Sequence, residues 1–147
     1  MKNFLWLTLL LLSCFHIYKL PEQVPTFEEL GINASEFNSI EKIIIYAETN
    51  IETIITDCHI MPWNVMRCKQ TDVLGKCAMV AWMCEQAELV ESAWIISAGS
   101  RYSLRNWYVA DELGNPLYNY DPTYVNVYQQ RTLNSVLYDF SQNRCGL

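Results

Sequence analysis

The fold is decided by a helical stretch, Gly75-Lys76-Cys77-Ala78-Met79-Val80-Ala81-Trp82-Met83-Cys84-Glu85-Gln86-Ala87-Glu88-Leu89. Ala, Met, Leu, Glu and Gln favour an α-helix, and no Gly or Pro follows Gly75 within it. Because nearly every residue from Ala78 to Cys84 is apolar, we expect a central, buried helix. Gly75 allows a sharp turn before it, which places Cys77 in the first turn. There the helix dipole lowers a thiol pKa and favours the nucleophilic thiolate; the alternative is a buried structural cysteine.

The composition of the 147-residue chain is that of a single globular domain. Apolar residues make up 51% of the chain and charged residues 18%, which excludes a disordered protein. The net charge is −6 and no run of Lys and Arg occurs. We therefore expect no nucleic-acid partner and no electrostatic attraction to an anionic membrane surface.

Residues 1–18 have the features of an export segment rather than of a folded domain. Lys2 precedes an apolar run from Phe4 to Leu12, which is typical of a signal peptide. The run ends in Leu11-Leu12-Ser13-Cys14, which resembles a bacterial lipobox, so Cys14 is a candidate lipidation site. The alternative is a short uncleaved anchor, although it is shorter than the ~20 residues of a membrane span. The expected location is the cell envelope or the medium, with membrane contact only through this segment or its lipid.

Export permits disulfide bonds, and the six cysteines can be divided accordingly. If Cys14 carries lipid and Cys77 is a free nucleophile, an even set remains: Cys58, Cys68, Cys84 and Cys145. Cys84 cannot bridge Cys77, because seven helical residues separate their Cα atoms by ~10 Å and a disulfide tolerates less than ~7 Å. Cys58 with Cys68 is the first pair to expect.

The rest of the sequence predicts helices first and strands second. Residues 19–32, with two prolines, form a predicted linker to one domain over residues 33–147. Apolar residues at helical spacing predict an amphipathic helix from Phe37 to about Ile55. Pro62 suits the first turn of a short helix that ends near Lys69.

Short apolar runs rich in β-formers follow. They predict strands at 93–97, 107–110 and 117–120, and the turn Leu113-Gly114-Asn115-Pro116 joins the last two into a hairpin. A fourth strand over 124–128 and a helix over 132–140 complete the pattern. This order predicts an α+β domain with helices packed on one side of an antiparallel meander.

Three stretches in sequence order resemble motifs of the transglutaminase-like superfamily of papain-type cysteine enzymes. They are Gly75-Lys76-Cys77 opening an apolar helix, Trp107-Tyr108-Val109 on a strand, and Asp121-Pro122-Thr123-Tyr124 after the hairpin. The resemblance covers roughly residues 37–127. It implies a papain/transglutaminase-like core, in which the buried helix with its N-terminal cysteine packs on a small antiparallel sheet. Trp63 also resembles an aromatic residue of exported bacterial members, and with Trp107 it is expected to border the oxyanion region or cleft.

The resemblance implies a catalytic triad in which one member has changed. Cys77 matches the nucleophile, and Asp121 matches the carboxylate that orients the base. Alignment on the strand motif places Arg105 at the histidine position, whereas a one-residue-shorter hairpin would place Asn106 there. Neither side chain can shuttle a proton near neutral pH. His59, which precedes the nucleophile in the sequence, is the candidate substitute base.

Two functions follow from this resemblance, both with a peptide or protein as partner. The first is an exported thiol-dependent amide hydrolase or acyltransferase. The alternative is a catalytically inactive binding module of the cell envelope that keeps the cleft. A third function, which does not depend on the resemblance, is that of a structural lipoprotein whose cysteines only brace the fold. We expect no cofactor and no metal, because the chain has no Cys-x-x-Cys motif and its only histidines are His16 and His59.

Overall fold

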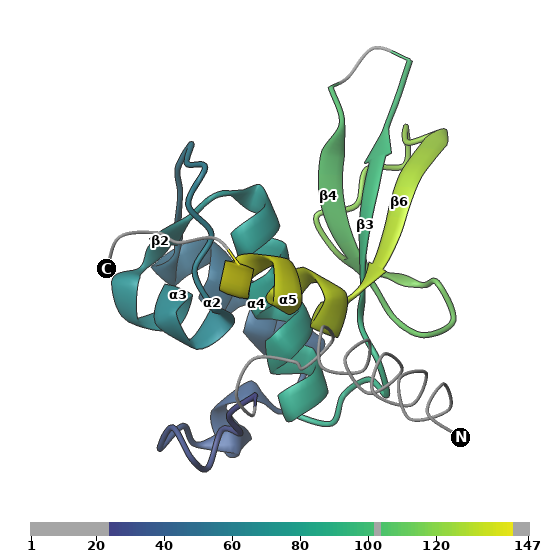
Figure 1. The fold of residues 1–147 in the computed structure, drawn as a ribbon. Coiled ribbons are helices and arrows are strands. Elements are labelled where there is room, and N and C mark those ends of the chain that lie inside the picture. The colour runs from purple at the N-terminus through teal and green to yellow at the C-terminus, as the bar shows by residue number, and fades with distance from the viewer. Residues whose placement is uncertain (1–23, 102–103, 143–147) are drawn as a thin grey trace, which may run out of the picture.

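A computed structural model describes residues 24–101 and 104–142 of the chain (Figure 1). The expected export segment, with Cys14 and His16, lies outside the described residues, as do Cys145 and part of the expected linker. The described residues form an α+β fold, which confirms the predicted class. No helix among them is long and apolar enough to cross a membrane.

Helices and two short strands alternate up to Gln86, and the strands of the main sheet follow before a last helix. The helical elements are η1 (Ala34–Phe37, a 3-10 helix), α2 (Ile40–Asn50), α3 (Pro62–Cys68), α4 (Val73–Gln86) and α5 (Leu133–Gln142). The strands are β1 (Glu52–Thr53), β2 (Gln70–Thr71), β3 (Trp94–Gly99), β4 (Asn106–Ala110), β5 (Pro116–Tyr118) and β6 (Asn126–Thr132).

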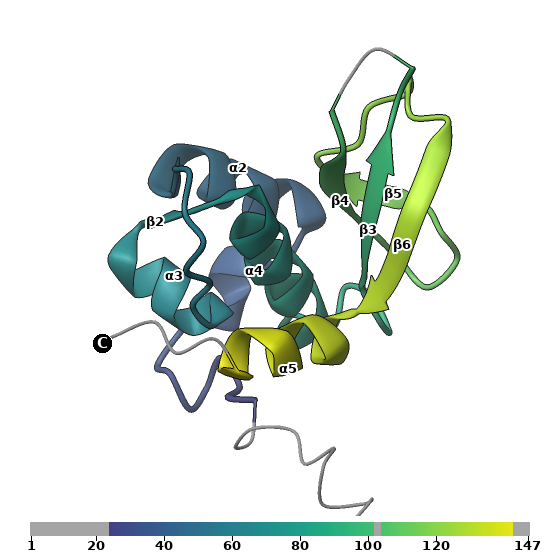
Figure 2. The same cartoon turned by 45° about the horizontal axis from the view of Figure 1, so that its top comes forward.

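Helix α4 is the centre of the domain, as the sequence predicts. Every residue from Gly75 to Cys84 is buried. The helix packs against α2, α3 and α5 on one side and against β4 on the other, and both views place it between the remaining helices and the sheet (Figures 1 and 2). The fully buried Trp82 meets Phe27 and Trp63 edge-on, with ring centroids 5.3 and 5.9 Å apart.

The start of α4 lies earlier than predicted. Asp72 is its N-cap, and the Asp72 Oδ1 atom accepts a hydrogen bond of 2.8 Å from the Gly75 backbone N–H. Because Asp is among the preferred N-cap residues, the segment expected to be a connection is already helical. Gly75 therefore lies inside the helix, beneath the Thr71 side chain. Cys77 is in the second turn rather than the first.

The predicted long helix from Phe37 to about Ile55 is divided and shorter. Asn33 caps η1 by accepting a hydrogen bond from the Ser35 N–H, and Ser39 caps α2. After Asn50 the chain becomes extended, so that β1 pairs in parallel with β2, a small sheet that the sequence analysis did not predict. The short helix that begins at Pro62 is confirmed.

The main sheet has the strand order β5-β4-β3-β6, and all neighbouring strands are antiparallel. The β4–β5 hairpin and the C-terminal helix α5 agree with the prediction. The simple meander is wrong, because β6 pairs with β3 instead of β5. The seven-residue β6 can pair along nearly its whole length with the six-residue β3, whereas β5 has only three residues to pair with.

The predicted bond between Cys58 and Cys68 is also wrong. Cys58 is disulfide-bonded, but Cys68 is a free and exposed thiol. The rigid helix α3 lies between the two residues and carries Cys68 ~9 Å from its own first residue. Cys77 and Cys84 are free and buried.

Candidate functional site

A cleft of about 470 Å³ lies between the helical half of the molecule and the sheet. Its walls are the loop of residues 53–59, the start of α4 with its N-cap, and the start of β4. The cleft brings together four of the residues selected from the sequence: His59, Arg105, Asn106 and Trp107. It is the place where α4 and β4, the elements that carry the first two motifs, come together.

Cys77 lies behind this wall and is fully buried. Its Sγ–H donates a hydrogen bond of 3.5 Å to the Trp107 backbone carbonyl. Burial, and then the nearby Asp72 carboxylate, raise the pKa of the Cys77 thiol far above its usual value, against a smaller opposing effect of Lys76. This direction is opposite to the one expected for a helix N-terminus. The thiolate is the nucleophilic form, so in this conformation Cys77 is a neutral core side chain.

Asp121 is engaged within its own turn. Its Oδ1 atom accepts hydrogen bonds of 2.8 Å from both the backbone N–H and the hydroxyl of Thr123. These bonds hold the pKa of the Asp121 carboxyl below its usual value. This is the local bonding expected of an Asp that starts a turn, and His59, the histidine of the described residues, pairs with Asp72 instead.

The histidine–carboxylate pair of this structure is His59 with Asp72. The His59 Nε2 and Asp72 Oδ2 atoms are 2.6 Å apart, and both side chains are mostly buried. The imidazole stacks on Phe140 of α5, with ring centroids 4.8 Å apart and an interplanar angle of 12°. Because the other Asp72 oxygen caps α4, this pair ties the cleft loop to α4 and α5. The sequence analysis missed Asp72, although an Asp just before an apolar helix is a capping signal.

Arg105 extends over the inner face of the sheet. Its Cζ atom lies 5.8 Å from the Trp107 ring centroid and 5.3 Å from that of Tyr128, within the range of cation–π contacts. Its Nε–H donates to the hydroxyl of Ser97, a side chain that is fully buried. The neighbouring Asn106 turns back to accept a hydrogen bond from the Trp107 N–H. Of the two residues considered for the family histidine position, Arg105 is the one that reaches over the sheet.

The Trp107 carbonyl joins the three elements behind the cleft. It accepts a hydrogen bond from the Cys77 thiol of α4. It also accepts one of 2.6 Å from the side-chain amide of Asn119, which follows β5. Trp63, expected at the cleft, packs instead into the core against Trp82. From its position on α3, the Trp63 ring contacts α4 in the core between the helices.

An ion pair between the buried Lys76 and the exposed Glu48 braces the Thr53 end of the cleft wall. The Lys76 Nζ atom lies 3.2 Å from the Thr53 hydroxyl and 3.4 Å from the Glu48 Oε1 atom, and only 6% of the Lys76 side chain is exposed. The Tyr118 hydroxyl donates to the same Glu48 oxygen. This hydrogen bond, followed by Lys76, holds the pKa of Glu48 below its usual value. Helix α2, helix α4 and strand β5 are thereby linked beneath the cleft.

Within residues 24–101 and 104–142, no three His, Cys, Asp or Glu side chains lie close enough to share a metal ion. The residues that line the cleft therefore offer one permanent cation, one histidine–carboxylate pair, a second carboxylate at Asp57 and an indole ring. No protein-family model, curated protein or solved structure matches this chain.

Proposed function

We propose that this chain is an exported, catalytically inactive protein of transglutaminase-like architecture whose cleft binds a peptide or protein ligand. The observation that carries the proposal is that the cleft is lined by Arg105, which the resemblance aligns with the family's histidine, while Cys77 is fully buried. The three family-like motifs occur in order, and a buried helix packs on an antiparallel sheet with a hairpin after β4. These features support a papain/transglutaminase-like core.

The chemistry of the cleft favours binding over turnover. A cysteine hydrolase needs a thiolate and a base that returns the proton to the leaving group. Here the thiol is neutral and donates to a backbone carbonyl, and the arginine stays protonated. General acid–base assistance, worth ~10²–10⁴-fold in rate, is thereby lost.

We place the protein in the cell envelope or outside the cell. The disulfide bond of Cys58 supports an oxidising compartment, since such bonds are rare in the cytosol. The N-terminal apolar run supports export, and lipidation of Cys14 would tether the protein to a membrane. Mass spectrometry of the mature N-terminus tests both points. An intact, unmodified Met1 in a cytosolic fraction would contradict them.

Ligand binding can be tested with a pool of synthetic hexapeptides that have free carboxyl termini. The pool is passed over the immobilised protein, retained peptides are identified by mass spectrometry, and their affinities are then measured. We expect the substitution Ile55→Asp, at a fully exposed residue of the cleft wall, to lower the affinity for the retained peptides by about tenfold or more. Leu113→Asp is the matched control, because Leu113 is 82% exposed and lies away from the cleft. Absence of retained peptides, or equal loss in both variants, would refute the proposal.

The hydrolase alternative retains one supporting observation, the His59–Asp72 pair in the wall of the same cleft. Catalysis would require a rearrangement that exposes Cys77 next to His59. Incubation of the hexapeptide pool with the protein and with Cys77→Ala separates the two functions. Cleavage or transacylation by the wild type alone would replace the binding proposal with an enzyme.

A further inference from the structure

Arg105 is held in place more firmly than an exposed arginine on a sheet usually is. Its Nε–H donates to the hydroxyl of the fully buried Ser97, and its guanidinium contacts the rings of Trp107 and Tyr128. The residues that hold it come from β3, β4 and β6, so the restraint spans the sheet. A side chain fixed by three neighbours has little rotamer entropy left to lose on binding a ligand.

The end of this guanidinium is open. An arginine has five N–H donors, and the Ser97 hydroxyl takes the one on Nε. Among the residues that the structure describes, no protein acceptor bonds the terminal Nη1 and Nη2 atoms. These two nitrogens form a planar fork that matches the two oxygens of a carboxylate.

The charge of Arg105 is also unpaired within the described part of the chain. Asp57 and Asp72 share the cleft, but neither forms an ion pair with Arg105 in the described structure. The two Asp72 oxygens cap α4 and bond His59. By contrast, Arg131 is paired within the chain, because its Nη2 atom lies 2.6 Å from the Asp139 carboxylate and donates to the Ser135 carbonyl at 2.8 Å. In a chain with a net charge of −6, a cation kept free in a cleft is a site for an outside anion.

We propose that Arg105 is the carboxylate receptor of this cleft. The ligand carboxylate accepts hydrogen bonds from Nη1–H and Nη2–H, and the apolar part of the ligand lies along the cleft wall at Ile54 and Leu74. The carboxylate belongs either to a peptide C-terminus or to an acidic side chain. This inference rests on the proposed function, because it names the ligand chemistry of the same cleft.

The test uses three matched peptides and the disulfide-bonded protein labelled with ¹⁵N. The peptides are Ac-Ala-Ala-Ala-Ala with a free carboxyl terminus, the same peptide as a C-terminal amide, and Ac-Ala-Ala-Glu-Ala amide. Binding is followed through the Arg105 Nε–H and Trp107 indole N–H signals. We expect one of the acidic peptides to bind about tenfold or more tightly than the neutral amide, and which one it is identifies the source of the carboxylate.

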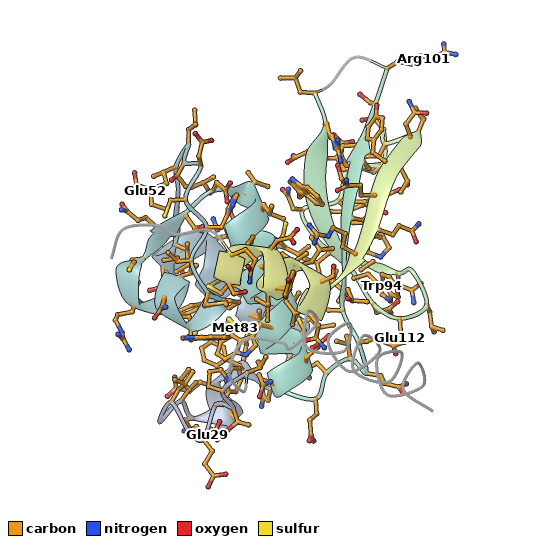
Figure 3. The ribbon with its side chains drawn as sticks, viewed as in Figure 1. Glu29, Glu52, Met83, Trp94, Arg101 and Glu112 are labelled. Carbon is orange, nitrogen blue, oxygen red and sulfur yellow. The ribbon has the colours of Figure 1, made fainter. Side chains whose placement is uncertain are left out.

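Variants separate the fork from the bare charge. Arg105→Gln should remove the preference for the acidic peptide, and Arg105→Lys, which keeps the charge but not the fork, should restore only a small part of it. Arg101→Gln is the control, since Arg101 is exposed at the far tip of the β3–β4 connection (Figure 3). Thermal melts of all variants check that the fold is intact.

The outcomes distinguish the two proposals. If the neutral amide binds in the cleft as tightly as the acidic peptides, or if Arg105→Gln keeps the preference, the carboxylate inference is overturned and the binding function stands. If no peptide, and no excess of acetate, moves either signal, both proposals are overturned.

Discussion

The sharpest test of the fold around the cleft is the substitution Gly75→Ala. Gly75 lies in the first turn of α4, directly beneath the buried side chain of Thr71. A Cβ atom built on Gly75 would lie 1.9 Å from the Thr71 Oγ1 atom and 3.1 Å from its Cβ. Contacts below 3.0 Å do not persist, so one of the two backbones would have to move by about an ångström.

Two opposing terms set the size of the effect. Alanine in a helix interior is favoured over glycine by about 1 kcal/mol. Overpacking of a closed core costs about 1–3 kcal/mol. Rotation of Thr71 would not relieve the crowding fully, because its own Cβ would still lie 3.1 Å from the new methyl group and its side chain is buried. Since the 1.9 Å contact is severe, we take the upper part of that range, about 2–3 kcal/mol, and expect a net loss of about 1–2 kcal/mol in the free energy of unfolding. The position of His59 in the cleft should also change, because its partner Asp72 directly follows Thr71 in the chain.

The assay is urea unfolding followed by tryptophan fluorescence, with Trp82 as a fully buried reporter. The urea midpoint of Gly75→Ala should fall by roughly 0.5–1 M. Thr71→Ala alone should be near neutral, since it loses a methyl contact but removes a buried hydroxyl that has no hydrogen-bond partner in the structure. In the double variant the clash is gone, so the two changes should couple by about 1 kcal/mol or more. A Gly75→Ala protein as stable as the wild type, or additive effects, would refute the steric argument.

Two further predictions concern the thiols and acid stability. Iodoacetamide should label Cys68 in the native protein but Cys77 and Cys84 only after unfolding, because burial raises both thiol pKa values, to about 12 for Cys84; equal labelling of Cys68 and Cys77 in peptide maps would contradict this. The pKa of Glu48 lies below its ordinary 4.5, chiefly because Tyr118 donates to it, so its stabilising contribution is complete above pH 4.5 and is lost as the pH falls through the lowered value. The urea midpoints of wild type and Glu48→Gln should therefore converge as the pH falls through the lowered pKa, and a difference that stays constant until the protein unfolds in acid would contradict the assignment.

The sequence predicts α4 well because burial on all sides is visible as an unbroken apolar run. Its start is harder to predict, because Thr71 to Gly75 contains both a capping Asp and a helix-breaking Gly. The glycine favours a turn, but in the structure it makes room for Thr71 from a neighbouring strand. Thr71 belongs to β2, whose parallel pairing with β1 has only two residues in each strand and leaves no periodic pattern. The helix start moves from Gly75 to Val73 because Asp72 caps it, which places Cys77 in the second turn.

The residues of the candidate site also differ in how far they can be predicted from the sequence. Arg105 and Trp107 can be found from the sequence, because they belong to one strand and keep a fixed spacing. The His59–Asp72 pair depends on a loop that packs against two helices distant in the sequence, so local patterns do not report it. Asp121 shows the converse case, since its motif is clear and yet its carboxylate bonds its own turn.

On the proposed function, Arg105 stands where a related enzyme would carry its catalytic histidine, and its neighbours can be compared with what each residue type would need. A histidine there would exchange a proton with the thiol, which requires a partner that approaches Cys77. An arginine keeps its charge throughout the physiological pH range. It is stabilised by cation–π contacts with aromatic rings and by a hydrogen bond to a buried hydroxyl. Tyr128 and Ser97 supply these from β6 and β3, while the Cys77 thiol bonds the backbone of β4 instead. The surroundings of Arg105 thus suit a fixed cation, and Arg105→His alone would not make Cys77 reactive, because the thiol stays buried and bonded to the Trp107 carbonyl. We expect Cys77 in Arg105→His to be as unreactive toward iodoacetamide as in the wild type. A labelled Cys77 in that variant would contradict this reasoning and would favour the hydrolase alternative.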